Sequence, residues 1–210
     1  MANNTHFILM GDIIKSRTFP APQLYKEFSE LLNSCNKNNE KYILSPYAVT
    51  LGDEFQGLAK SAESALKTIF YLEEDMLARQ FKFKIRYVLL EGAIDTPINT
   101  RIAYRMLGKG LTTAREMLDK KKRTRRFRFE IENKTLENRL VNLFIVYEEI
   151  TRKWPNKDQS IISEMINSSE NEIVGRKFQK THAQIWKRRR NLQINGYNAI
   201  VELALDVAKS

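Results

Sequence analysis

The order of strand-like and helix-like patterns is the sequence feature that most constrains the fold. Before Trp154-Pro155-Asn156, short apolar or alternating runs follow one another with amphipathic stretches between them. Strand patterns cover residues 6–12, a hairpin at 43–58, 83–94 and 126–131, and helical patterns cover 23–37, 61–79, a stretch ending near 120, and 136–152. The order β-α-β-β-α-β with an α/β extension predicts an α+β, ferredoxin-like domain over residues 1–152, built as one antiparallel sheet with helices on one face.

After that point only helical patterns remain, so residues 153–210 are expected to form a small all-α domain. The patterns lie at 158–166, 170–178, 182–192 and 198–208. A short helix, a turn and a basic helix are typical of a helix-turn-helix, whose second helix enters the major groove of DNA. Base-edge contacts are expected from Thr181, His182 and Gln184, and phosphate contacts from Lys180, Lys187, Arg188 and Arg190. Ile185 and Trp186 are expected to pack in the small core. The alternative is that these C-terminal helices form a dimerisation module.

The charge distribution favours an anionic partner. The net charge is +10 and the isoelectric point is near 9.6. Basic residues concentrate in residues 119–139, with nine Lys/Arg against four acids, and in residues 176–190, with seven and no acid. Solvated surface faces are the alternative explanation. Phe127 and Phe129, interleaved with arginines, fit either base stacking or packing of one strand face.

Several classes of protein do not fit this sequence. It contains no 18-residue apolar run and no secretory signal pattern, so no membrane association and a cytoplasmic location are expected. Cys35 is the only cysteine, which excludes an intrachain disulfide and a zinc–cysteine cluster. The two histidines, His6 and His182, are isolated, so a histidine metal site is not expected.

Two acidic corners follow predicted strands. Asp12 ends the apolar run that begins at Phe7, and Asp53 and Glu54 lie at the tip of the hairpin in Thr50-Leu-Gly-Asp-Glu-Phe-Gln-Gly57. If the strands are neighbours, the carboxylates converge, and such hard oxygen ligands suit a divalent cation carrying phosphate. The alternative is that these aspartates only accept hydrogen bonds from turn amides.

The chain resembles the SatD family of bacterial proteins over nearly its whole length. The resemblance is carried by Gly11-Asp-Ile-Ile-Lys-Ser-Arg17, by the hairpin segment ending at Gly57, by Gly-Lys-Gly-Leu-Thr-Thr-Ala-Arg-Glu at 108–116, and by the C-terminal helix-turn-helix pattern. The family's biochemical role is poorly defined, so this resemblance implies little about function.

The N-terminal part also resembles the palm of nucleotidyl cyclases. The matching features are Asp12-Ile13 at a strand end, Asp53 at a hairpin tip, Arg86-Tyr-Val-Leu-Leu-Glu-Gly92, and Thr113-Ala-Arg115. Leu111 stands where that family has an asparagine, four residues before the arginine. The resemblance therefore implies a nucleotide-sized metal site more than it implies cyclisation.

On this hypothesis Asp12 and Asp53 coordinate Mg²⁺ or Mn²⁺, with Glu54 as a third ligand or a nearby acceptor. The amides of Ile13 to Ser16 bind phosphate, and Lys15, Arg17 and Arg115 supply positive charge.

These observations predict a regulator that binds DNA through its C-terminal helix-turn-helix and senses a nucleotide or phosphorylated ligand with its N-terminal domain. A homodimer is expected because such proteins usually read paired half-sites. One alternative is a nucleotidyl cyclase-like or other phosphodiester enzyme whose C-terminal unit serves targeting or dimerisation. Another is a metal-free structural module.

Overall fold

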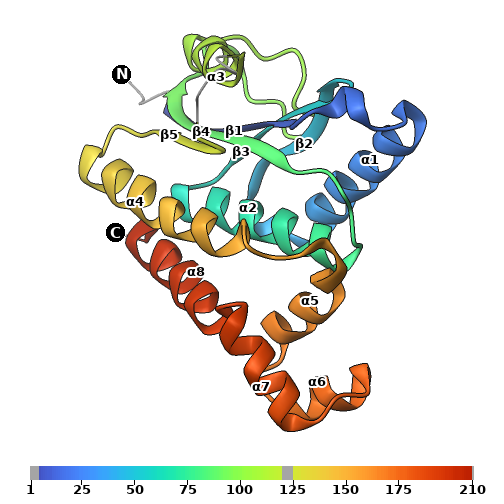
Figure 1. Cartoon of the computed structure of the whole chain (residues 1–210). Helices are drawn as coiled ribbons and strands as arrows, with labels where there is room; N and C mark the ends of the chain where they lie inside the picture. Colours follow the sequence, from blue (N-terminus) through green and yellow to red (C-terminus); the bar gives the residue numbers. More distant parts are fainter. Residues whose placement is uncertain (1–4, 120–124, 210) are drawn as a thin grey trace.

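The computed structural model describes residues 5–119 and 125–209, which form an α+β structure around a five-stranded sheet (Figure 1). The strand order is β2-β3-β1-β4-β5. The strands are β1 (Thr5–Ile13), β2 (Ile43–Leu51), β3 (Glu54–Ala59), β4 (Ile85–Ala93) and β5 (Phe127–Glu130). Strands β1 to β4 pair with one another in antiparallel fashion, whereas β5 runs parallel to β4.

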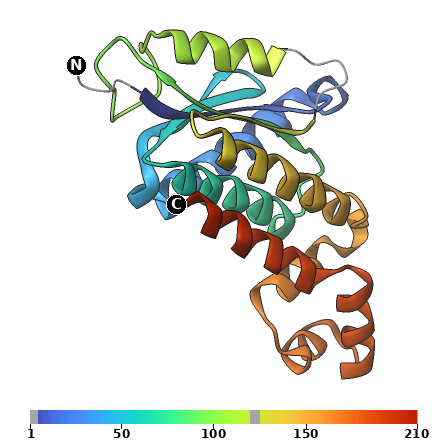
Figure 2. The ribbon, with the colours of Figure 1, turned by 90° about the vertical axis from the view of Figure 1, so that its left-hand side faces the viewer.

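Helices cover both faces of the sheet (Figure 2). One face carries α1 (Ala21–Asn38), α2 (Ala62–Ala78) and α4 (Lys134–Thr151), and the other carries α3 (Lys109–Asp119). Short 3₁₀ turns lie at Ser16–Thr18, Glu40–Tyr42 and Asn156–Asp158. Alternate residues of β1 point into different cores: Leu9 lies in the core under α1, α2 and α4, and Met10 in the core under α3. The two cores are therefore separated by the sheet.

The expectation of one antiparallel sheet with helices on one face was wrong in two respects. The chain leaves β4, forms α3 and returns as β5, so β5 is parallel to β4 and α3 packs on the opposite face. A helical crossover between neighbouring parallel strands requires this arrangement. The prediction missed that Ile8, Met10 and Val88 make both faces of β1 and β4 apolar, which is typical of strands covered on both sides.

Aromatic side chains fill much of the larger core. Phe127 stacks on Tyr87 with ring centroids 5.3 Å apart, and Phe129 lies 5.0 Å from Phe144. Of the two explanations for the phenylalanines of β5, packing of one strand face is therefore correct. Cys35 is fully buried in the same core, and burial raises the pKa of its thiol to about 12.

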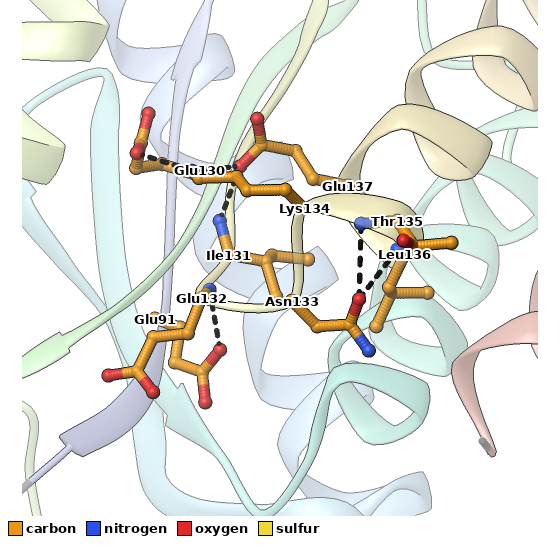
Figure 3. A network of polar contacts seen from close by, with 9 residues as sticks. All are labelled: Glu91, Glu130, Ile131, Glu132, Asn133, Lys134, Thr135, Leu136 and Glu137. Carbon is orange, nitrogen blue, oxygen red and sulfur yellow. Dashed lines mark hydrogen bonds and ion pairs between the residues drawn. The ribbon is translucent and has the colours of Figure 1, made fainter.

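A network of polar contacts fixes the corner between β5 and α4 (Figure 3). The Asn133 side chain accepts hydrogen bonds from the amides of Thr135 and Leu136, both at 3.1 Å, and thus caps α4. Glu137 accepts from the Ile131 amide at 2.8 Å. The two Asn133 contacts satisfy amides that the first helical turn cannot pair internally, and the Glu137 contact ties the preceding segment to the helix.

Asn133→Ala is expected to lower the free energy of unfolding by about 1 kcal/mol, because two amides at the start of α4 lose their acceptor. Urea denaturation followed by circular dichroism measures this change. Asn133→Asp, which keeps a cap acceptor, is the control and is expected to retain most of the stability. Equal losses in both variants would contradict a capping role.

The C-terminal helices extend away from the sheet and then return to it (Figure 1). They are α5 (Gln159–Asn167), α6 (Asn171–Phe178), α7 (His182–Asn191) and α8 (Ile194–Ala208). The first three enclose a small apolar core that includes Ile162, Val174 and Ile185. The last helix, α8, starts earlier than expected, at Ile194, and packs along α4 and α2. None of the helices within the described ranges is long and apolar enough to cross a membrane.

Candidate functional site

The end of β1 and the tip of the β2–β3 hairpin lie side by side, as the sequence predicts. Asp12 is opposite Glu54 in the strand register, and the Ile13 amide donates to the Asp53 carbonyl oxygen at 2.9 Å. Gly52 supports the tip in the left-handed region, with φ +53°. Beside this junction lies an open cleft of about 1110 Å³. Its polar lining residues are Asp12, Lys15, Ser16, Arg17, Thr18, Asp53 and Arg86.

Asp12 is held by an arginine that the sequence prediction missed. The Arg86 Nη1 atom donates to Asp12 Oδ2 at 3.0 Å, and the two side chains are only 13% and 4% exposed. A buried ion pair of this kind neutralises the carboxylate. The signal for it was a basic residue directly before the apolar residues 87–90 of β4.

The predicted metal ligands do not form a ready cation site. Within residues 5–119 and 125–209 there is no group of three or more His, Cys, Asp or Glu side chains arranged to hold a metal ion. Asp53 lines the cleft with Asp12, but Glu54 is not among its lining residues. Burial raises the pKa of Glu54, with the charge of Arg115 opposing the shift. Asp12 is paired to Arg86, so a cation here would share that carboxylate with the guanidinium.

The predicted phosphate-binding turn is only partly available. The amide of Ile13 donates to Asp53, and the amide of Ile14 donates to the Lys84 carbonyl at 2.8 Å, so both are already used. The Ile13 amide, predicted to bind phosphate, is therefore engaged by the hairpin in this structure. Lys15 follows in the left-handed conformation, φ 57°, and its side chain lines the cleft together with Ser16 and Arg17. Successive amides at such a turn are suited to an anion.

The helix α3 contributes less to the cleft than the cyclase resemblance implied. Arg115 is half-buried and does not line the cleft, although its charge acts on Glu54. Leu111 is buried in the core between α3 and the sheet, next to Ile8 and Val88. An apolar side chain facing the core cannot take the place of a polar group that orients a ribose.

A second candidate surface is formed by α6, the turn at residues 179–181, and α7. Gly175 allows the close approach of α6 to this turn, because a Cβ there would lie 2.6 Å from the Lys180 carbonyl oxygen. The basic face of α7 points outward: Lys180, Lys187 and Arg190 are exposed and have no ion-pair partner in the described part of the chain. Trp186 is 51% exposed beneath the Arg190 guanidinium, so the expectation that it packs in the core was wrong, whereas Ile185 is buried.

The other four predicted DNA-contacting residues have partners within the protein. Thr181 and Gln184 form a reciprocal capping box at the start of α7, with bonds of 3.3 and 2.9 Å. His182 lies 3.5 Å from Glu172, and Arg188 forms an ion pair with Asp158. All except the half-buried Arg188 remain exposed.

Sequence reasoning also missed a structural arginine. The Arg189 side chain donates to the Met165 and Ser168 carbonyl oxygens at 2.8 and 2.7 Å and to Asn171 at 3.0 Å. These bonds fasten α7 to the connection between α5 and α6. The only available signal was its place in the run Lys187–Arg190, which does not distinguish an inward from an outward arginine. In the other basic run, residues 119–139, Lys120, Lys121, Lys122 and Arg123 lie outside the described residues.

The fold and these two surfaces define an α+β protein with a mixed five-stranded sheet and a helical C-terminal part. The chain belongs to the SatD family, whose model matches residues 6–192. No curated protein matches it.

Proposed function

We propose that this protein is a ligand-responsive regulator that binds DNA. Residues 153–210 form the DNA-binding unit, a helix-turn-helix in which α7 enters the major groove. Residues 1–152 form a sensor domain with a ferredoxin-like, cyclase-palm arrangement of β1–β4. The observation that carries the proposal is the outward basic face of α7 behind a rigidly packed turn.

The charge and shape of α7 support DNA over a protein partner. Seven basic residues and no acid lie within residues 176–190. Lys180, Lys187 and Arg190 are exposed along this segment, while the buried Arg189 fixes the orientation of the helix. Cations on one face of a second helix suit phosphate contacts, which supply affinity but little sequence information.

Fluorescence anisotropy with a labelled duplex tests the DNA-binding role. The protein is expected to bind random-sequence DNA at about 50 mM salt and to lose at least about tenfold in affinity by about 200 mM, because bound phosphates release counterions. No affinity at the lower salt concentration would remove DNA from the proposal. We also propose a homodimer, since paired helix-turn-helix units read paired half-sites, and sedimentation on DNA measures the stoichiometry.

The cleft at the end of β1 is the proposed ligand site. Because Arg86 neutralises Asp12, Lys15 and Arg17 outnumber the remaining lining acid, Asp53. The lining also includes Phe19 and Tyr25, and Tyr25 is 57% exposed. Basic and aromatic lining residues together suit a phosphorylated molecule with a flat body, such as a nucleotide. Mg²⁺ or Mn²⁺ is proposed to arrive with the phosphates rather than to reside in the free protein.

A nucleoside triphosphate is expected to raise the melting temperature by about 3–5 °C at about ten times its Kd, because it binds only the folded state. Lys15→Met/Arg17→Met should abolish the shift, whereas Asp53→Asn should remove only the part that depends on Mg²⁺ or Mn²⁺. Lys37→Met/Lys41→Met, which removes the same charge elsewhere, is the matched control. The sensor role fails if no nucleotide shifts the transition with or without the cation.

A further inference from the structure

A small pocket lies where the sheet domain meets the C-terminal helices, away from both surfaces described above. Its volume is about 70 Å³. Its walls come from the second half of α2, the segment leading into β4, the end of α4 and the segment entering α5. The lining residues used below are Glu73, Phe81, Phe83, Lys84, Arg126 and Trp154.

Aromatic rings line part of this pocket. The rings of Phe81 and Phe83 lie 5.4 Å apart at 26°, close to parallel, and both line the pocket. Trp154 lines it from the C-terminal side and packs against Tyr197 with ring centroids 5.0 Å apart. Because these rings are held by their neighbours, a planar apolar group can stack on them without reordering the wall.

The polar end of the pocket carries an excess of positive charge. Among the described lining residues the acid is Glu73, which already accepts hydrogen bonds from Arg126 and from the Tyr87 hydroxyl, so its charge is compensated. Glu148, outside the lining, also acts on Lys84. Lys82 and Lys84 also line the pocket, and neither forms an ion pair with an acid in the described ranges. Partial burial and the charge of Arg126 lower the pKa of the Lys84 ammonium, so a nearby anion would stabilise its charged form.

We infer that this pocket binds a small organic anion with a flat apolar body, of the chemical class of the aromatic carboxylates. The carboxylate lies beside Lys84 and Lys82, and the ring packs against Phe81 and Trp154. The binding itself does not depend on the function proposed above.

The position of the pocket makes such a ligand an effector of the C-terminal helices. Gln159, at the start of α5, donates from Nε2 to the Phe81 carbonyl oxygen at 2.8 Å. Trp154 Nε1 donates to the Leu192 carbonyl oxygen, just after α7, also at 2.8 Å. A ligand here contacts the groups that set the angle between the two parts. This coupling rests on the proposed DNA-binding role.

Isothermal titration calorimetry of the full chain with benzoate and phenylacetate tests the binding site. Benzamide and phenylacetamide serve as neutral counterparts of the same shape. A Kd on the order of 1 mM is expected for an anion of this size, with the amides at least about tenfold weaker. Lys84→Met should weaken carboxylate binding by about tenfold or more, and Thr151→Trp should block it by filling the pocket. Lys37→Met is the charge-matched control, and circular dichroism checks that each variant is folded.

Three results would overturn the inference: no binding of either carboxylate at about 10 mM, equal binding of carboxylate and amide, or unchanged binding in folded Lys84→Met. DNA affinity measured with and without benzoate is a separate readout. A change in DNA affinity that is lost in Lys84→Met supports the coupling. Carboxylate binding without any DNA affinity supports the pocket and contradicts the proposed regulator, so the two failures are distinguishable.

Discussion

Replacing Glu73 with alanine is expected to lower the free energy of unfolding by about 3–5 kcal/mol. Glu73 is 8% exposed and lies against the Arg126 guanidinium, whose side chain is 12% exposed. The Tyr87 hydroxyl also donates to it at 2.8 Å. Without the carboxylate, a buried cation and a buried hydroxyl lose their partner together. Urea unfolding monitored by circular dichroism measures the change.

An exposed ion pair in the same domain provides the control. Glu130 lies 2.9 Å from Lys134, but their side chains are 52% and 59% exposed. Glu130→Ala is therefore expected to change stability by less than about 1 kcal/mol. Glu73→Leu/Arg126→Met, which removes both buried charges, should recover part of the loss. If the Glu73 and Glu130 variants lose the same stability, burial does not determine how much each ion pair contributes to the free energy of unfolding.

The triple variant Lys180→Ala/Lys187→Ala/Arg190→Ala is expected to lower DNA affinity by about 100-fold at low salt. These side chains are exposed on or just before α7 and have no ion-pair partner in the described ranges. Each lost phosphate contact should also reduce the slope of log affinity against log salt by about one unit. Anisotropy titrations at several salt concentrations measure both quantities.

If net charge alone determined DNA affinity, removing any three exposed cations would weaken binding equally. A matched variant separates this explanation from binding through α7. Lys26→Ala/Lys37→Ala/Lys41→Ala removes three exposed cations in and just after α1. It should leave the affinity within about twofold if α7 is the DNA-binding surface. Equal losses in the two triple variants would mean that binding follows total charge and that α7 has no special role.

Most secondary structure was predictable from the sequence because its patterns are strong and local. The apolar spacing of α1 and the turn at Gly52-Asp53 each indicated the correct element. The sheet topology was harder to predict, because the direction of β5 depends on how α3 crosses the sheet. Both faces of β1 and β4 are apolar, so the pattern alone did not show which helices cover which face.

The position of the candidate site was predictable from the sequence, but the ion pair between Asp12 and Arg86 was not. Apolar runs ending at Asp12 and Asp53 indicated two neighbouring corners, and the register of β1 with β3 brings them together. The ion pair of Asp12 with Arg86 joins residues 74 positions apart and depends on the register of β1 with β4. No local pattern encodes such a contact. The same reason explains why the inward direction of Arg189 was missed.

The return of α8 to the sheet domain couples the position of α7 to that domain. Tyr197, near its start, donates from its hydroxyl to Glu74 of α2 at 2.9 Å, and α7 ends only a few residues before it. A helix of 15 residues is about 22 Å long, so a 10° tilt moves one end by about 4 Å relative to the other. A displacement of that size exceeds the length of a hydrogen bond. If α7 binds DNA as proposed, a tilt of α8 against α2 and α4 is therefore expected to shift α7 relative to a DNA groove.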